Sequence, residues 1–241
     1  MQPPLTPVTE AGATHGNSSN PAQLSAELAA LFPAGVVAVE LTSEAPRAVL
    51  TELELKSISH CAEKRIQDFT RGRACARRAL QELDIENFSL LSGDKREPLW
   101  PPQIVGTITH TTGFAAAVVA RGSDIGAVGI DCEIVASVGE DLWERICTPT
   151  EQARLAQLPQ TEAQQQAALI FAAKESFYKC QFPISREWVG FEDVSVDILD
   201  AGRLCIVPHV RLPVTDDWVA SLVGRYQFRG PWVITGICSR L

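Results

Sequence analysis

A short apolar stretch at residues 128–133 ends in two carboxylates, Asp131 and Glu133, with one residue between them. The apolar run predicts a strand, in which successive side chains point to opposite faces. Asp131 and Glu133 should therefore share one face, while Ile130 and Cys132 point to the other. Carboxylates this close raise each other's pKa unless a cation lies between them, and Mg²⁺ binds one or two carboxylates together with substrate phosphates. The stretch indicates a metal site; the alternative is a solvated strand end.

The composition limits the class of protein. A chain of 241 residues forms one compact unit or two modest halves. Hydrophobic residues at 46% and charged residues at 21% are typical of a folded globular protein. The 29 acidic and 21 basic side chains give a net charge of −8, which argues against a general binder of nucleic acid or anionic membranes. Any phosphate recognition must therefore come from a local pocket.

The cysteines and the N-terminal residues indicate the cellular compartment of the protein. The 7 cysteines are scattered and include no C-x-x-C pair, which favours reduced thiols in the cytoplasm. No apolar run reaches membrane-spanning length, and the N-terminus lacks the features of a signal peptide. Residues 1–20 are rich in Pro, Thr, Gly, Ser and Asn, and we expect them to form a flexible tail.

A 3.6-residue period predicts a long helix at about residues 59–83. Its apolar stripe consists of Ile66, Phe69, Ala76, Leu80 and Leu83. Arg73 falls on this stripe, and an arginine there must either reach the surface or meet an anion. Further cations lie around it, at Lys64, Arg65, Arg71, Arg77 and Arg78. The helix could face a phosphate, or it could present a solvated basic face with pairs such as Arg78 with Glu82.

The segment after this helix combines a turn-rich loop with a hairpin. The loop at residues 93–102 contains two adjacent cations, Lys95 and Arg96. Residues 104–110 and 114–120 are strand-like and are separated by a Thr-Thr-Gly turn, which predicts a hairpin with His110 at its tip. That histidine could be structural or could contact a phosphate.

A second helix is predicted at about residues 161–180, where Glu175 and Lys179 share a face with small apolar residues. The carboxylate needs a partner on this face, and an intrahelical pair with Lys179 would provide one. Strands are predicted near residues 35–41, 194–199, 203–207, 218–227 and 232–239, and a short helix at 23–31. The last three strands resemble an antiparallel meander.

Several motifs in one order resemble a known family. G-I-D-C-E at residues 129–133, followed about forty residues later by F-A-A-K-E-S-F-Y-K at 171–179, resembles the paired signature of Sfp-like 4′-phosphopantetheinyl transferases. Four other segments are similar to the actinobacterial PptT-like branch: F-T-R-G-R-A-C-A-R at 69–77, G-D-K-R-E-P-L-W at 93–100, I-T-H at 108–110 and W-V-G-F-E-D at 188–193. Phe171 stands where many relatives have Trp, and Ser176 where Ala is usual. The resemblance covers roughly residues 62–193. Six motifs in the same order are far more specific to a family than any single motif.

The resemblance implies an enzyme that transfers 4′-phosphopantetheine from coenzyme A to a serine of an apo acyl or peptidyl carrier protein, releasing 3′,5′-ADP. It implies an α+β fold of two similar halves in a pseudo-twofold arrangement, with the active site at their interface. The halves would span residues 21–124 and 125–241. The expected protein is a cytoplasmic monomer that binds neither nucleic acid nor membrane.

The resemblance also implies roles for individual residues. Mg²⁺, with Mn²⁺ as an alternative ion, would be held by Asp131, Glu133 and Glu175. Glu175 would complete the metal site or act as base, and Lys179 would contact the diphosphate during catalysis. The residues expected to bind coenzyme A are Arg65, Arg73, Lys95, Thr109, His110, Lys174 and Lys179.

Two other functions use the same residues differently. A metal-dependent nuclease or phosphohydrolase would also cluster carboxylates with lysine, but its substrate favours a broadly basic surface. A non-catalytic carrier-binding module would leave these charges on the surface.

Overall fold

The computed structural model describes residues 22–45, 47–200 and 202–241. The predicted tail at residues 1–20 lies outside this part. The first half contains β1 (Gln23–Leu24), α1 (Ala26–Ala29), β2 (Val37–Leu41), the 3-10 helix η1 (Arg47–Val49), α2 (Glu52–Ile58), α3 (Glu63–Gln81), β3 (Ile104–Thr111) and β4 (Phe114–Arg121). The second half contains β5 (Ala127–Ile134), the 3-10 helix η2 (Val135–Ser137), α4 (Glu140–Ile146), α5 (Pro149–Leu155), α6 (Gln160–Ser185), β6 (Val194–Ile198), β7 (Arg203–Pro208), α7 (Asp216–Ala220), β8 (Leu222–Arg229) and β9 (Trp232–Ser239).

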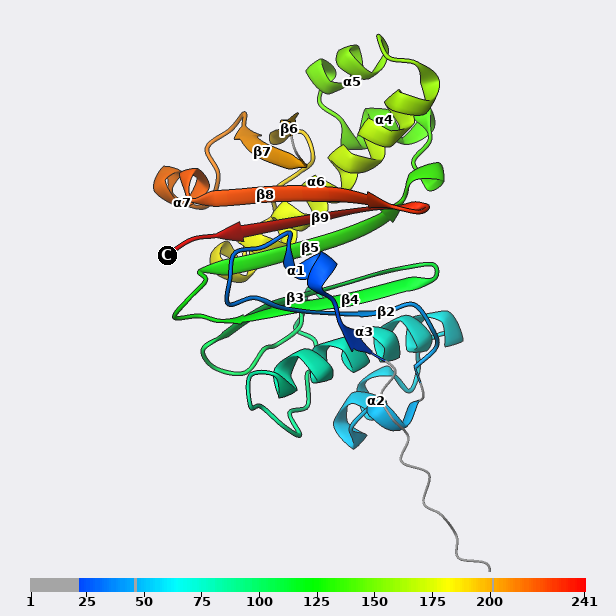
Figure 1. Ribbon diagram of the computed structural model, residues 1–241, viewed down its shortest axis with the longest axis vertical. Helices are drawn as coiled ribbons and strands as arrows, with labels where there is room; N and C mark the ends of the chain where they lie inside the picture. The colour runs from blue at the N-terminus through cyan, green and yellow to red at the C-terminus, as the bar shows by residue number, and fades with distance from the viewer. Residues whose placement is uncertain (1–21, 46, 201) are drawn as a thin grey trace, which may run out of the picture.

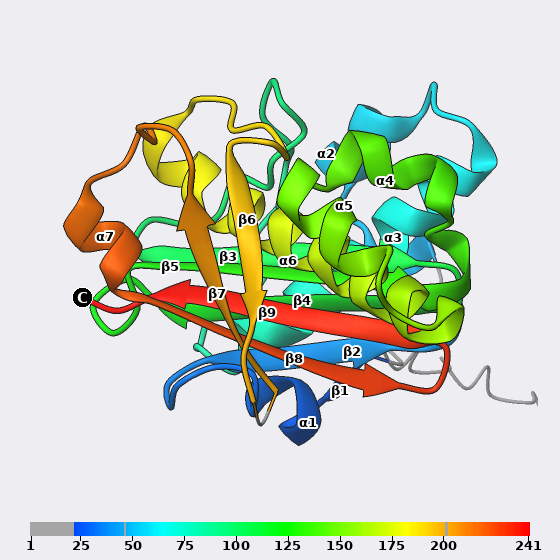
Figure 2. The same cartoon turned by 90° about the horizontal axis from the view of Figure 1, so that it is seen from above.

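Two antiparallel sheets organise these elements. One has the strand order β1-β2-β4-β3 and the other β5-β9-β8-β7-β6. Figure 1 shows α3 against the first sheet, and Figure 2 shows α4, α5 and α6 together on one side of the second. The arrangement confirms the α+β class and its two halves. The predicted boundary after residue 124 falls in the turn between β4 and β5, but the domain limits themselves stay a prediction.

Strand β4 is buried on both faces. Ala115, Ala117 and Val119 pack with the apolar residues of α3, whereas Ala116 and Val118 belong to a core shared with β5 and β9 of the other sheet. A strand covered on both sides reads as a continuous apolar run rather than an alternating one. The two halves are therefore joined by a common core.

Close packing of α6 on β5 brings the two predicted signatures together. A Cβ atom on Gly129 would lie 1.9 Å from the backbone oxygen of Ser176, so only glycine permits this approach. Because side chains alternate along β5, Asp131 and Glu133 lie on the same face as Gly129 and thus face α6.

The predicted hairpin and meander are confirmed. Strands β3 and β4 pair with Thr111 opposite Phe114, leaving a two-residue turn in which Gly113 has a φ of +77°. His110 is the penultimate residue of β3 and so lies beside this turn. Strands β7, β8 and β9 are antiparallel neighbours.

Several element limits differ from prediction. Trp218, expected at the start of a strand, lies in helix α7, because the Thr215 side chain accepts a hydrogen bond from the Trp218 amide and caps the helix. The predicted helix at 23–31 is a two-residue strand followed by α1. Helix α6 continues past residue 180 and through Pro183, ending at Arg186 in the left-handed conformation.

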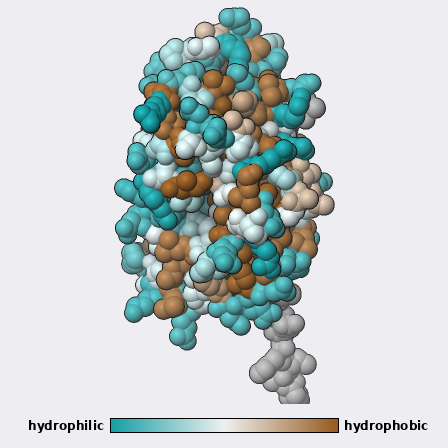
Figure 3. Space-filling model, turned by 90° about the vertical axis from the view of Figure 1, so that its left-hand side faces the viewer, coloured by the Kyte–Doolittle hydropathy of each residue, from teal (hydrophilic) through white to brown (hydrophobic). Residues whose placement is uncertain are grey.

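In the described ranges, no helix is both long and apolar enough to cross a membrane. On the face shown in Figure 3, hydrophobic side chains are interspersed among hydrophilic ones rather than gathered in one continuous patch.

Candidate active site

Asp131 is the centre of a polar cluster where β3, β5 and α6 meet. Its side chain is buried, at 6% exposure. Its Oδ1 accepts hydrogen bonds from the Thr109 hydroxyl at 3.0 Å and from the Lys179 ammonium at 2.6 Å. Its Oδ2 is buried and has no hydrogen-bond partner among the described residues. A buried carboxylate oxygen without a partner is costly and indicates a missing ligand.

Three carboxylates and one ammonium interact in this cluster. Burial, together with the charge of Asp131, raises the pKa of Glu133 to about 8. Burial also raises the pKa of Glu175, against the opposing effect of Lys179. Burial lowers the pKa of Lys179, but the surrounding carboxylates, Asp131 first, more than offset it, so its pKa is raised overall. The cluster carries more negative charge than one lysine can balance.

The donor set fits a hard divalent cation. All three acidic side chains offer oxygen donors, and the unpartnered Oδ2 of Asp131 is an available ligand. As the side chains stand, however, no three His, Cys, Asp or Glu residues of the described part are close enough together to hold an ion. Binding a cation would therefore require side-chain movement within the cluster, where Lys179 now occupies Oδ1 of Asp131.

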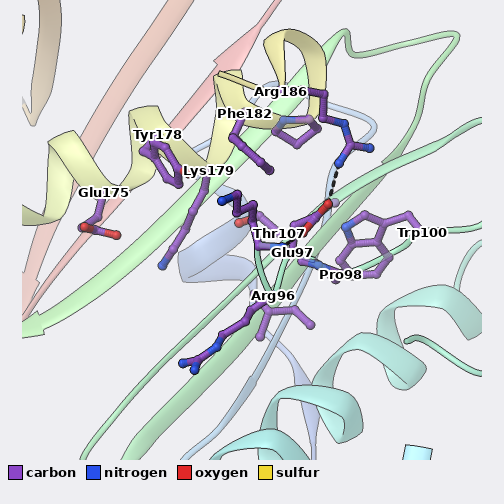
Figure 4. A pocket seen from close by; sticks show the side chains of 14 residues that line it. Arg96, Glu97, Pro98, Trp100, Thr107, Glu175, Tyr178, Lys179, Phe182 and Arg186 are labelled. Carbon is purple, nitrogen blue, oxygen red and sulfur yellow. Dashed lines mark hydrogen bonds and ion pairs between the residues drawn. The ribbon is translucent and has the colours of Figure 1, made fainter. Parts of the chain in front are cut away.

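A cleft of about 220 Å³, which we call the main cleft, opens beside this cluster. It lies between the loop at residues 95–100 of the first half and the C-terminal part of α6 (Figure 4). Glu175 and Lys179 line one end, and the rest of the lining combines aromatic and proline side chains with the charged residues Lys95, Arg96, Glu97 and Arg186. Its lining residues include Pro98, Trp100, Tyr178, Phe182 and Pro183. Such a channel suits a largely apolar chain that ends in a charged group.

A second, smaller pocket of about 100 Å³ lies between α3, the same loop and β3, and we call it the cationic pocket. Its cations are Arg65, Arg73 and Arg96, and Asp68 and His110 also line it. Burial lowers the pKa of His110, although Asp68 opposes the effect. Arg96, Pro98 and Ile108 line both pockets, so the cationic pocket adjoins the main cleft.

Most of the predicted coenzyme A residues line one of these pockets. Arg65, Arg73 and His110 line the cationic pocket, and Lys95 and Lys179 line the main cleft. The intrahelical alternative for Glu175 is not what the structure shows, because the ion pair of Lys179 is made to Asp131.

Arg73 does not reach the surface, which was one of the two alternatives considered for it. It is buried at 6% exposure, and its guanidinium lies 4.1 Å from the centre of the Phe69 ring. It donates to the backbone oxygen of Leu90 at 2.6 Å and to the Ser92 hydroxyl at 3.0 Å. Burial lowers its pKa to about 10, so the group stays charged at neutral pH. Arg73 thus anchors the loop after α3 and borders the pocket, while Arg78 and Glu82 form the predicted surface pair.

Two residues predicted to contact phosphate have other partners in the structure. The side chain of Thr109 is buried, and its hydroxyl donates to the Asp131 carboxylate. Lys174 points away from the site, and its ammonium donates to the Glu151 carboxylate at 2.7 Å and to the backbone oxygens of Ile146 at 2.9 Å and Phe191 at 2.7 Å. All three of its protons are used, and the group is 2% exposed.

Sequence reasoning did not assign several residues of the site. Arg96 lines both pockets, and Tyr178, Trp100, Glu97 and Arg186 line the main cleft. The adjacent cations of the loop were a signal for Arg96, and the position of Tyr178 three residues after Glu175 was a signal for its face. No local pattern pointed to Arg186, which lies beyond the predicted helix end.

Comparison with known proteins identifies the family. Residues 53–120 match the 4′-phosphopantetheinyl transferase N-terminal domain, and residues 127–229 match the 4′-phosphopantetheinyl transferase superfamily. The chain is 36% identical over 159 residues to 4′-phosphopantetheinyl transferase PptT of Mycobacterium tuberculosis, covering 65% of this chain and 69% of that protein. It is 33% identical over 211 residues to 4′-phosphopantetheinyl transferase Npt of Nocardia iowensis, covering 85% and 93%.

The chain therefore belongs to the 4′-phosphopantetheinyl transferase superfamily, and it is an enzyme of that class. Membership favours the transferase over the nuclease and the non-catalytic module. Among solved structures, a holo-(acyl-carrier-protein) synthase from Bacillus anthracis in complex with CoA (3′,5′-ADP) is similar with a TM-score of 0.39 and 21% identity, covering 48% of this chain and 97% of that one.

Proposed function

We propose that this protein transfers 4′-phosphopantetheine from coenzyme A to a serine of an apo acyl or peptidyl carrier protein, in a Mg²⁺-dependent reaction that releases 3′,5′-ADP. The observation that carries the proposal is the adjacency of the cationic pocket, the main cleft and the carboxylate cluster. A nucleotide with several phosphates joined to a long flexible arm could place its phosphates in the cationic pocket and its arm in the main cleft, beside the carboxylate cluster. The family membership supports the same reaction.

The chain's own side chains account for binding. Arg65, Arg73 and Arg96 would hold phosphates of the nucleotide by charge-assisted hydrogen bonds. Lys179, at the end of the main cleft, would contact the diphosphate. The apolar lining of the cleft would receive the pantetheine arm and limit the access of water.

The transfer step forms one bond and breaks another. The carrier serine oxygen bonds to the phosphorus that bears pantetheine, the bond from that phosphorus to the bridging oxygen breaks, and 3′,5′-ADP leaves with that oxygen. The serine proton passes to a carboxylate, for which Glu175 is our candidate because its raised pKa suits a base. Mg²⁺, held by Asp131 and Glu133 and, if it is not the base, by Glu175, would neutralise charge on the diphosphate.

The remaining features are part of the same proposal. We propose a cytoplasmic protein, since the seven cysteines are free thiols. The monomeric state stays a prediction. Nucleic acid and membranes are not proposed as partners, because the chain carries a net charge of −8.

Mass spectrometry tests the function directly. Incubation with coenzyme A, Mg²⁺ and several apo carriers of fatty-acid, polyketide and nonribosomal-peptide synthases should add one phosphopantetheine group to at least one carrier. The reaction should stop when the metal is chelated. If no carrier gains mass while a known transferase modifies the same preparations, the proposal is wrong.

Arg65 should be needed for coenzyme A binding. It lines the cationic pocket, and none of the ion pairs between described residues includes it. Arg65→Gln should weaken coenzyme A binding by roughly tenfold or more, the range for a lost charge-assisted hydrogen bond. Isothermal calorimetry measures this. Arg78→Gln is the matched control on the same helix, and equal affinities of the two variants would contradict the assignment.

The effect of Mg²⁺ on stability should depend on pH. Since the pKa of Glu133 is about 8 in the folded protein against 4.5 ordinarily, the folded state binds the proton more tightly, and stability falls as pH rises through this window. A cation binds the ionised carboxylate and opposes that loss. Mg²⁺ should therefore raise the Tm more at pH 8.5 than at pH 6, as measured by calorimetric melting. Glu133→Gln should reduce the difference, and an equal Mg²⁺ effect at both pH values in the parent protein would argue against Glu133 as a ligand.

A further inference from the structure

The loop that carries Lys95 and Arg96 is a tight reverse turn. The amide of Leu99 donates to the Leu91 oxygen at 2.9 Å, that of Gly93 to the Glu97 oxygen at 2.8 Å, and that of Arg96 to the Gly93 oxygen at 2.9 Å. Arg96 has a φ of +68°, a conformation that residues with a side chain rarely adopt. The turn therefore holds Arg96 in a backbone state that it would not favour alone.

One ion pair fastens this loop to the other half of the protein. Arg186 Nη1 donates to Glu97 Oε1 at 2.5 Å, and Glu97 Oε2 accepts from the Lys95 amide at 3.0 Å. The Glu97 side chain is largely buried, at 16% exposure, whereas that of Arg186 is 57% exposed. Arg186 is itself placed by the end of α6, where its φ is +60° and its amide donates to the Phe182 oxygen at 2.9 Å.

The Glu97–Arg186 ion pair lies next to the binding site. Figure 4 shows Glu97 reaching toward Arg186, while the side chain of Arg96 extends away from Arg186 on the other side of the loop. Arg96 is also the cation that lines both the cationic pocket and the main cleft. A carboxylate that is bonded both to the Lys95 amide and to Arg186 fixes the backbone immediately beside Arg96.

We propose that the Glu97–Arg186 pair is a strap between the two halves that positions Arg96 at the junction of the two pockets and so sets the affinity for coenzyme A. Glu97 and Arg186 are positioning residues in this proposal, which rests on the proposed function. Without the strap, the loop remains in place through its own hydrogen bonds but is no longer held to α6. The carboxylate cluster around Asp131 makes no hydrogen bond or ion pair with either residue in the described part, so its chemistry should be unaffected.

A double-mutant cycle on the full chain tests the strap. The variants are Glu97→Gln, Arg186→Gln and the combination, with Kd for coenzyme A from calorimetry and kcat at saturating coenzyme A with an apo carrier. We expect each single variant to bind coenzyme A roughly tenfold more weakly, and the double variant no more weakly than either, because both break one interaction. The kcat should stay within about twofold of the parent value, since the transfer chemistry is unchanged.

Two comparisons make the test specific. Arg203→Gln removes a surface ion pair with Asp200 in which the arginine has a similar exposure, 56%, and it should leave coenzyme A binding unchanged. In an Arg96→Gln background, adding Glu97→Gln should cause no further loss, because the strap acts through Arg96.

The outcomes separate the two proposals. Additive losses, a loss confined to kcat, or parent affinity in the single variants would overturn the strap while leaving the transferase function standing. If the parent protein itself fails to bind coenzyme A, the proposed function is wrong, and so is the proposed role of the strap.

Discussion

Asp131→Asn should lower the rate of phosphopantetheine transfer by roughly 100-fold or more, the range for losing a preorganised electrostatic group or a metal ligand. Asn keeps the shape of the side chain but removes the charge that Lys179 and Thr109 now orient. Oδ2, the buried oxygen without a partner, also ceases to be an anionic ligand. The measurement is the initial rate of carrier modification at saturating coenzyme A, with the Tm recorded to show that the variant is folded.

Two companion variants interpret that loss. Thr109→Val removes one hydrogen bond to Asp131 and should have a milder effect, because the carboxylate remains. Glu175→Gln should also lower transfer by about 100-fold if it is metal ligand or base. Loss of a ligand should weaken Mg²⁺ binding and be partly rescued by excess metal, whereas loss of a base should leave metal affinity nearly intact. Parent-like transfer by a folded Asp131→Asn protein would remove the cluster from the mechanism.

Lys174→Ala should destabilise the protein by about 3–5 kcal/mol, the usual cost of leaving one partner of a buried ion pair alone. Glu151 is 2% exposed, and its Oε2 accepts from Lys174 and from the Thr148 amide, while its Oε1 accepts from the Val196 amide. Without the ammonium, its carboxylate stays buried among fewer donors. Urea unfolding measures the change in the free energy of unfolding.

The controls distinguish this role from phosphate binding. Lys64→Ala changes an exposed lysine on α3 and should alter the free energy of unfolding by no more than about 0.5 kcal/mol. The double variant Lys174→Met with Glu151→Gln should be less destabilised than Lys174→Ala, because no buried charge remains. If Lys174→Ala lost coenzyme A affinity at unchanged stability, the lysine would be a phosphate contact after all.

Regular periodicity explains what could be predicted about the site. A strand places Asp131 and Glu133 on one face, and a helix places Glu175 and Lys179 one turn apart, whatever the rest of the chain does. The hairpin of β3 and β4 and the meander of β7 to β9 likewise follow from strand patterns and turn residues close together in sequence. The ordered motifs then indicated the family, which the relatives confirm.

Long side chains were the least predictable part of the site. Lys174 directly precedes Glu175, but adjacent residues on a helix differ by about 100° in direction, so it faces α5 and the buried Glu151. Arg73 lines the same pocket as Arg65, but two of its nitrogens donate hydrogen bonds to the Leu90 backbone oxygen and the Ser92 hydroxyl. A sequence motif shows which residue is present, whereas the position of a long cationic side chain depends on the acceptors that lie near it in the folded structure.

The sequence by itself therefore determined the classes of element, the residues that share a face and the family. The tertiary structure decided which faces meet. Gly129 lets α6 approach β5. Because of this approach, Lys179 forms its ion pair with Asp131 and not with Glu175. Arg186 meets Glu97 only because the two halves pack together, since the two residues lie 89 positions apart. Backbone geometry sets the periods that a sequence displays, but contacts between distant segments depend on how the whole core packs, and no local pattern encodes them.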